Sequence, residues 1–427
     1  MYKRQVSEPN YTPADLEKVT CPALIVQGEH DRVNALNKHA QFIARHIPAA
    51  ELWIPAGIGH NVHDEILKEW LEHITDFFAR RGAAVNDRLY HYKLEHHSDE
   101  RDGMFDVHLG EDGILSGTVL TEEMHAEAIS QVKEPFASDQ IKILINQDTP
   151  WALFNRPVED LRRKPSVLAE RVSQARMGET ARVLASDPEW SQVRLEHDGY
   201  IGWVHTTSLF PCGEGEVEFY QSGCNAIVSA LQAEAWDEAG VNIQKIPFAT
   251  LLSVQETGKQ ESLIQLPDGR IWRLKTSDLL PFEQRPHPTP EGITRTLSLI
   301  QHFCGVPYLW GGRTPYGFDC SGLAGTFYAF MGVTILRDAD QQFRAGAVVE
   351  GEPQPGDLLF FGEEDEENNS EDGTGFHISH VAISLGADEF IHANGTDWGV
   401  AYNSFDPTSK LYRKWLHENY RGARRFR

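Results

Sequence analysis

The sequence is poor in cysteine and has no long apolar run. Its five cysteines, at positions 21, 212, 224, 304 and 320, are odd in number and scattered along 427 residues. Such usage is typical of free thiols in a reducing compartment rather than of a disulfide framework. No stretch of about eighteen apolar residues occurs, and the first residues, MYKRQVSEP, lack the apolar core of a secretory signal. We therefore expect a cytoplasmic protein without a membrane partner.

Positive charge is also scarce, because 39 lysines and arginines stand against 63 acidic residues and the formal net charge is −24. A surface of this charge repels nucleic acid, anionic lipid and anionic wall polymers, so we expect no nucleic-acid partner. The histidines do not form, with cysteine or aspartate, a set of residues that has the spacing of a zinc site. Neither a metal nor another cofactor is therefore expected.

One cysteine stands in a distinctive setting near the C-terminus. The run PYLWGGRTPYGFDCSG covers residues 307–322 and places Cys320 between an acidic residue and Ser-Gly. The following stretch to Met331 is apolar at helical spacing and breaks at Gly332, so the thiol begins a predicted helix. The positive end of a helix dipole favours thiolate and lowers a thiol pKa that is normally ~8.5. Cys320 is therefore a candidate nucleophile.

A base for this nucleophile follows about sixty residues later. Residues 380–386 predict a strand, and residues 389–394 predict its antiparallel partner after a turn at 386–388. His380 and His392 would then lie on one face of a hairpin that faces the helix of the cysteine. A nucleophile, a base and a third group that fixes the tautomer of the base make up a peptidase triad.

These motifs resemble those of an NlpC-type cysteine peptidase, a papain-like domain that cleaves bacterial cell-wall peptides. Residues 307–322, 354–361, 380–381 and 391–393 carry the resemblance in the order and spacing of the family, within a predicted domain at residues 290–427. The resemblance implies that Cys320 is the nucleophile, His380 the general base and His392 the orienting group.

Further site residues follow from the same resemblance. Tyr308 matches a tyrosine near the oxyanion, Ser321 follows the nucleophile in the substrate site, and Arg337 with Asp338 matches a substrate-side pair. The family usually has serine after that aspartate, whereas this chain has Ala339, which removes one polar contact.

The middle of the chain carries a repeat. Residues 198–211 and 268–281 align without gaps, seventy residues apart, with a glycine turn, an alternating strand, a Thr/Ser turn and a closing Leu-x-Pro. Short strands with regular turns predict a small β-barrel twice, at residues 149–213 and 214–285. Both resemble bacterial SH3-like domains, and the second holds an apparent helix near residues 225–239.

Two SH3-like domains before an NlpC domain resemble the γ-D-glutamyl-L-diamino acid endopeptidases of murein recycling (YkfC-like enzymes). The resemblance implies hydrolysis of the γ-D-Glu–diamino acid amide in small murein peptides, with L-Lys or meso-diaminopimelate, that have a free N-terminal L-Ala. In that family a glutamate, a tyrosine and an aspartate hold the amine end, and by position these are Glu170, Tyr200 and Asp319. Glu179 is the alternative to Glu170.

Other interpretations remain open. Tyr200 could instead be a core aromatic of the barrel, and Glu170 a solvated strand residue. A non-catalytic wall-peptide-binding module would use the same barrels, and an acyltransferase would use the same Cys–His pair.

The chain as a whole is predicted to be a multidomain α+β protein. Its N-terminal part adds two segments to the three domains described above. Residues 1–85, with a helix over 65–81, resemble the last third of an α/β-hydrolase, with Asp31 and His60 at the acid and base positions. No Gly-x-Ser-x-Gly motif occurs, so we expect a fusion relic or a packed segment rather than a serine hydrolase. Residues 86–148 predict a small α/β region of unknown role. The acidic run at 362–375 is expected to be a solvated loop.

Overall fold

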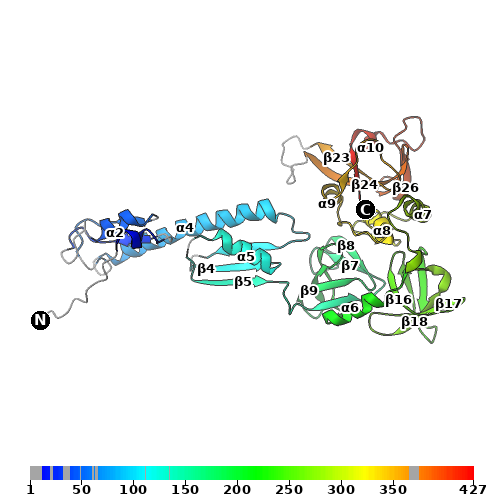
Figure 1. Ribbon diagram of the computed structural model, residues 1–427, viewed down its shortest axis with the longest axis horizontal. Coiled ribbons are helices and arrows are strands. Elements are labelled where there is room, and N and C mark those ends of the chain that lie inside the picture. The colour runs from blue at the N-terminus through cyan, green and yellow to red at the C-terminus, as the bar shows by residue number, and fades with distance from the viewer. Residues whose placement is uncertain are drawn as a thin grey trace. The chain divides into compact units, whose positions relative to one another are not determined.

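The structure is a computed structural model, and it divides the chain into two compact units. Met1–Ser98 and Met104–Asn146 form the first unit, and Asp99–Gly103 and Gln147–Arg427 form the second. The structure describes residues 12–19, 23–31, 39–48, 50–59, 62, 66–110, 112–133, 135–364 and 375–427. These residues form an α+β protein with several separate sheets (Figure 1).

The first unit begins with a small α/β arrangement. After α1 (Pro13–Leu16), β1 (Ala23–Val26) pairs in parallel with β2 (Ala50–Trp53), and α2 (Ala40–His46) connects them in the sequence. Asp31 follows β1, whereas His60 lies outside the described residues, as do residues 365–374 of the acidic run.

A long helix continues past the end that the sequence predicts. α4 (Leu67–His96) runs without interruption through Gly82. The boundary predicted after residue 85 therefore lies inside a helix. Val85 and Leu89 in its second half are buried in a core with Phe105 and Leu115. Burial of these side chains outweighs the roughly 1 kcal/mol that glycine costs in a helix interior.

A three-stranded sheet completes the first unit. β3 (Phe105–Leu109) pairs antiparallel with β4 (Ile114–Val119), which pairs in parallel with β5 (Ser138–Ile143). α5 (Glu122–Gln131) connects the parallel pair, and the Thr121 hydroxyl caps it by accepting the Met124 N–H at 3.3 Å. The part of the chain between residues 105 and 143 thus holds both strands and a helix.

Two seven-stranded sheets follow in the second unit, with the orders β12-β6-β9-β10-β11-β7-β8 and β15-β14-β18-β17-β16-β13-β19. The predicted repeat is confirmed as β11 (Ile201–His205) with β12 (Leu209–Cys212), and as β18 (Ile271–Lys275) with β19 (Leu279–Pro281), each joined by a 3-10 turn. The other strands are β6 (Trp151–Phe154), β7 (Val158–Arg162), β8 (Arg171–Arg176), β9 (Thr180–Ser186), β10 (Trp190–Leu195), β13 (Ala226–Val228), β14 (Gln232–Trp236), β15 (Ile243–Pro247), β16 (Leu251–Thr257) and β17 (Glu261–Gln265).

The helix of the second barrel is not where the sequence predicts it. Residues 225–239 hold β13 and β14, and the helix is α6 (Glu214–Gly223), which precedes them. The Glu216 carboxylate accepts the Gly213 N–H at 2.7 Å and caps this helix, while Val217 and Tyr220 are buried. The prediction was wrong because β13 pairs with β16 and β19.

The C-terminal domain packs helices on a six-stranded sheet of order β22-β27-β23-β24-β25-β26. α8 (Cys320–Phe330) is buried almost all round, and Leu323 and Phe327 share a core with Ile383 and Ile391 of the sheet. The other elements are α7 (Pro290–Ile300), β20 (Arg313–Thr314), β21 (Gly317–Phe318), α9 (Ala339–Ala345), β22 (Ala347–Val348), β23 (Leu358–Glu364), β24 (Phe376–Gly386), β25 (Glu389–Asn394), β26 (Gly399–Ser404), α10 (Lys414–Glu418) and β27 (Tyr420–Arg425).

Candidate active site

The candidate nucleophile is the first residue of α8. Asp319 is the N-cap of this helix, and its carboxylate accepts the Gly322 N–H at 2.7 Å. The Cys320 sulfur accepts hydrogen bonds from the backbone N–H groups of Ser321 and Val381. Val381 follows His380 on β24, so its contact places the thiol next to this strand.

Burial opposes the helix dipole at this thiol. Desolvation, together with the charge of Asp319, raises the pKa of Cys320 to about 12, although the hydrogen bonds from Val381 and Ser321 act in the other direction. The prediction of a lowered thiol pKa was therefore wrong, because loss of hydration outweighs the partial charge of a helix end. Thiolate forms when a base accepts the proton.

The candidate base lies on the predicted hairpin, which is confirmed. β24 and β25 pair antiparallel with Ile383 opposite Ile391. Nε2 of His380 lies 2.6 Å from Nδ1 of His392, so Nδ1 of His380 is the nitrogen left for the thiol. Burial, with a smaller effect of His392, lowers the pKa of His380 well below its usual 6.5. The ring is therefore neutral near pH 7 and able to accept a proton.

Two asparagines lie beside the His392 ring, and the sequence prediction missed both; Asn403, whose oxygen accepts from the ring, orients it. Nε2 of His392 lies 2.7 Å from Oδ1 of Asn403 and 2.9 Å from Nδ2 of Asn394. We assign the Nε2 proton to the shorter contact. Nδ1 of His392 then accepts the proton of His380 Nε2, which leaves His380 Nδ1 with its lone pair able to accept a proton. Burial lowers the pKa of His392 to about 4 despite its bond to Asn403.

These asparagines differ in how far sequence could reveal them. Asn394 stands two residues after His392 on one strand, so period-two alternation places both on the same face. Asn403 reaches the ring from β26, where Ala401 is opposite His392. Finding it requires the strand register, which no local pattern supplies.

Cys320 lines a cavity of about 370 Å³. The structure brings six predicted substrate residues into its wall, namely Glu170, Tyr200, Tyr308, Asp319, Ser321 and Asp338. Glu170 and Tyr200 come from the first barrel, and the others come from the C-terminal domain. The cavity therefore lies between two domains of the same compact unit.

Comparison with known proteins agrees with this arrangement. Residues 305–425 match the NlpC/P60 family, and residues 161–209 match the bacterial dipeptidyl-peptidase Sh3 domain. The chain contains an NlpC/P60 cysteine peptidase domain. It also contains a bacterial SH3 domain, and it is a hydrolase of the cysteine peptidase class.

Individual relatives span most of the same region. One relative is a "Gamma-D-glutamyl-L-lysine dipeptidyl-peptidase" of Bacillus cereus (strain ATCC 10987 / NRS 248), which is 26% identical over 268 residues. The match covers 60% of this chain and 74% of that relative. A Bacillus subtilis (strain 168) protein of the same name is 29% identical over 57% of this chain and 78% of its own. A crystal structure of a Bacillus cereus ATCC 10987 NlpC/P60 family protein covers 64% of this chain and 99% of its own, with a TM-score of 0.55 and 22% identity. This last likeness shows a shared fold.

Arg337 lies behind the cavity wall of the NlpC/P60 domain and neutralises Asp319. Its two terminal nitrogens donate to the two Asp319 oxygens at 3.1 and 2.7 Å. It also donates to Ser321 Oγ at 2.9 Å and to Ser173 Oγ of the SH3 domain at 3.0 Å. With the Gly311 N–H at 2.9 Å and the Gly322 N–H, Asp319 uses the roughly four acceptor positions of a carboxylate. Asp319 is therefore saturated as an acceptor.

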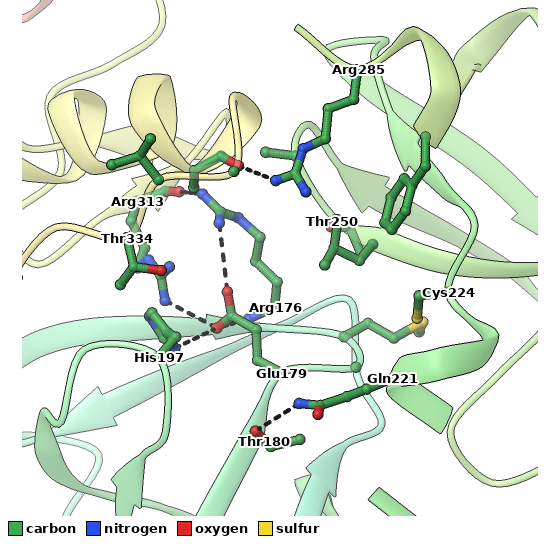
Figure 2. Close-up of a pocket in the computed structure, with 18 residues that line it drawn as sticks. Arg176, Glu179, Thr180, His197, Gln221, Cys224, Thr250, Arg285, Arg313 and Thr334 are labelled. Atoms are coloured by element: carbon green, nitrogen blue, oxygen red, sulfur yellow. Dashed lines mark hydrogen bonds and ion pairs between the residues drawn. The ribbon is translucent and has the colours of Figure 1, made fainter. Parts of the chain in front are cut away.

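The structure separates Glu170 from its alternative. Glu170 accepts hydrogen bonds from Arg163 at 2.6 Å and from Trp310 Nε1 at 2.9 Å in the Cys320 cavity. Glu179 lines a different cavity of about 330 Å³, beside Ala329 near the other end of α8. Figure 2 shows its carboxylate between two arginines, and its contact with Arg313 is 3.0 Å. Glu170 is thus the glutamate of the pair that faces the nucleophile.

Tyr200 serves the barrel core and the cavity together. Its side chain belongs to the apolar core of the first barrel, and its hydroxyl donates to Asp338 Oδ2 at 3.1 Å. Burial raises the pKa of Asp338, although Arg337 and Arg101 favour its charged form. The interpretation of Tyr200 as a core aromatic therefore does not exclude a contact with ligand.

Arg101 is a cavity residue that the sequence prediction missed. It stands in the run Asp-Glu-Arg-Asp of segment 99–103, which belongs to the same compact unit as the peptidase domain. Its guanidinium donates to Asp338 at 3.0 Å and to Asp340 at 2.6 Å. No local motif marks this arginine, because its partners stand more than 200 positions further along the chain.

A second cavity lies on the other side of the histidines. Its volume is about 380 Å³, and Tyr308, Ser379, His380 and His392 line it together with residues 394–397 and 413–416. Tyr308 and Ser379 also line the Cys320 cavity. A substrate that spans both cavities would pass the nucleophile and the base.

The described part of the chain lacks two further features. No helix there is long and apolar enough to cross a membrane. No group of three or more histidine, cysteine or acidic residues there could hold a metal ion.

Proposed function

We propose that this enzyme hydrolyses the amide bond between γ-D-glutamate and the following L-diamino acid in murein peptides with a free N-terminal L-Ala. The observation that carries the proposal is the Cys320 cavity, which presents the carboxylates of Glu170 and Asp338 and the hydroxyl of Tyr200. The name shared by the two Bacillus relatives supports the same bond type.

The amine end of the substrate would bind Glu170 and Asp338. An ammonium group that leaves water needs anionic partners, and Asp319 has no acceptor position left for it. An acylated peptide would bring no positive charge to these carboxylates, and a longer peptide would place its amine elsewhere. Such a site rejects the wrong peptide more strongly than an apolar pocket could.

The chemistry follows from the Cys320–His380–His392 arrangement. The Cys320 thiol transfers its proton to His380 Nδ1 as the sulfur attacks the γ-carbonyl carbon. The backbone N–H of Cys320, which has no partner inside its helix, and the Tyr308 hydroxyl would donate to the oxyanion. His380 then protonates the leaving amine, and the C–N bond breaks. Water, activated by His380, finally cleaves the thioester.

The leaving L-diamino acid would occupy the second cavity. Arg413 and Lys414 in its wall offer positive charge for a carboxylate, and Asp397 offers negative charge for an amine. Both L-Lys and meso-diaminopimelate carry such groups, so both are proposed substrates.

The proposed setting is the recycling of small murein peptides in the cytoplasm. The scattered cysteines, which are typical of free thiols in a reducing compartment, support that location. Nucleic acid and membranes are not proposed as partners. The resemblance of residues 1–85 to an α/β-hydrolase fragment stays a prediction, and we assign no catalytic role to it.

One assay tests the proposal. Purified enzyme is incubated with L-Ala-γ-D-Glu-L-Lys and with the meso-diaminopimelate peptide, and products are followed by mass spectrometry. We expect L-Ala-D-Glu and the free diamino acid, and none of either with Cys320→Ala. If the tripeptide stays intact and Cys320 does not react with iodoacetamide, the proposal is wrong.

The same assay separates the alternatives. Tight tripeptide binding without turnover would instead indicate a wall-peptide-binding module. Transfer of the acyl group to an added amine in preference to water would indicate an acyltransferase.

A further inference from the structure

Arg101 reaches the active-site cavity from outside both recognised domains. It belongs to segment 99–103, whereas the family matches cover residues 161–209 and 305–425. Its side chain is 25% exposed. It donates to Asp99 at 2.8 and 2.7 Å, to Asp340 at 2.8 and 2.6 Å, and to Asp338 at 3.0 Å. The five N–H donors of a guanidinium are thereby used, so Arg101 has none left for a ligand.

Segment 99–103 is bound to both domains that form the cavity. The Arg101 carbonyl accepts the Ile201 N–H of the SH3 strand β11 at 2.7 Å. The Asp99 carboxylate accepts from Gln341 at 3.0 Å and from Arg344 at 3.3 Å, both on α9 of the peptidase domain. The arginine is therefore held from two sides in one position.

Arg337 and Arg101 both favour the charged form of Asp338. Burial opposes its ionisation, and Asp319 and Asp340 add negative charge around it. Two cations act in the other direction, Arg101 in direct contact and Arg337 at 4.0 Å. Arg337 is bidentate to Asp319, whereas Arg101, which also binds Asp99, donates a hydrogen bond directly to Asp338. Tyr200 contributes a neutral hydrogen bond.

We propose that Arg101 is a positioning residue that holds the Asp338 carboxylate ready for the α-amine of the substrate. Segment 99–103 is then a third component of the active site, beside the NlpC/P60 and SH3 domains. The inference rests on the proposed function, because it assumes a substrate with a free N-terminal amine.

The test compares Arg101→Gln and Arg101→Lys with the unmodified enzyme on L-Ala-γ-D-Glu-L-Lys between pH 6 and pH 7.5. Loss of the guanidinium charge raises the pKa of Asp338 further, so more of it is protonated at pH 6. For Arg101→Gln we expect KM to rise at least ten-fold at pH 6 and less at pH 7.5, with kcat within two-fold. Arg101→Lys should recover part of the loss, because it restores the charge.

Arg344→Gln is the matched control. Arg344 pairs with Asp99 and Asp340 in the same cluster, at 3.3 Å from each. Its loss removes one positive charge from the cluster and leaves the Arg101–Asp338 contact intact. We expect its KM to stay within two-fold of the unmodified enzyme at both pH values.

Three results would overturn the inference. They are an unchanged KM in Arg101→Gln, a rise in KM that does not vary with pH, or an equal rise in Arg344→Gln. Turnover by the unmodified enzyme tests the proposed function separately. If it is absent, calorimetry of the tripeptide with Cys320→Ala and Cys320→Ala/Arg101→Gln still tests Arg101, with at least ten-fold weaker binding expected at pH 6.

Discussion

At the residue scale, the candidate nucleophile and the candidate base are both held in their neutral forms. Burial raises the pKa of Cys320 to about 12 and lowers the pKa of His380 well below 6.5. An ion pair of thiolate and imidazolium would have to overcome both shifts. The resting enzyme therefore holds a thiol and an imidazole, and the proton moves during attack on the substrate.

The pH dependence of alkylation tests this protonation state. The rate at which iodoacetamide modifies Cys320 should still rise between pH 7 and pH 9, because the thiolate fraction grows up to the thiol pKa. Peptide-level mass spectrometry measures the rate and distinguishes Cys320 from the other four cysteines of the chain. A rate that is already constant from pH 6 upward would show a preformed thiolate and contradict this interpretation.

Asn403 should matter for turnover and little for binding. Asn403→Ala removes the acceptor at 2.7 Å that fixes the proton on His392 Nε2, so both rings can adopt the wrong tautomer. Since general-base catalysis contributes about 10²–10⁴-fold, we expect kcat to fall at least ten-fold with KM within three-fold. Steady-state kinetics on the tripeptide measure both constants. An unchanged kcat would remove Asn403 from the relay.

At the element scale, the start of β8 and the loop before α8 make one wall. Glu170 precedes β8 and accepts the indole N–H of Trp310, which lies in the loop that leads to the nucleophile. Arg337, before α9, donates to Ser173 on β8. The proposed specificity would therefore depend on contacts between elements of two domains, whereas the proposed Cys–His chemistry would lie within the peptidase domain alone.

Substitution of Glu170 should change specificity without changing the thiol. Loss of a hydrogen bond to a charged group costs about 1.5–3 kcal/mol, so N-acetylation of L-Ala should lower turnover at least ten-fold in the unmodified enzyme. Glu170→Gln should shrink that preference, and Cys320 alkylation should stay the same. Competition between free and acetylated tripeptide measures the ratio. A full preference in the variant would show that the amine binds elsewhere.

At the scale of the whole molecule, the second barrel supports the far end of the nucleophile helix. Phe248, which is fully buried, stacks on Phe330 of α8 at 4.4 Å and meets Phe303 edge-on at 5.0 Å. Arg285, just after the barrel, donates to the Phe330 carbonyl at 2.9 Å and so binds the C-terminal end of the helix. The barrel is therefore part of the support of the active site.

Phe248→Ala should destabilise the second unit strongly. Removal of a buried phenylalanine ring costs about 3–5 kcal/mol of unfolding free energy. Denaturant unfolding, followed by tryptophan fluorescence, measures the loss. Phe219→Ala is the control, because Phe219 is 74% exposed and its loss should change stability by less than about 0.5 kcal/mol. Equal losses in the two variants would contradict the proposed support.

Local patterns in the sequence were sufficient for much of the peptidase domain. The helix from Cys320, the hairpin of His380 and His392, and the repeated barrels were predicted and found, because periodicity and glycine turns act over a few residues. Local patterns misplaced the helix near residue 225, where pairing with distant strands outweighed the apparent helical spacing.

By itself, the sequence predicted Cys320 and His380 as nucleophile and base, and it was sufficient to recognise an NlpC/P60 domain after an SH3 domain. The tertiary structure decided the protonation of Cys320, the saturation of Asp319 and the entry of Arg101 into the cavity. The pKa of Cys320 depends on the burial of the whole side chain, and Arg101 meets Asp340 across 239 positions of the chain. Burial and long-range pairing have no local signature, because they depend on residues that only folding brings together.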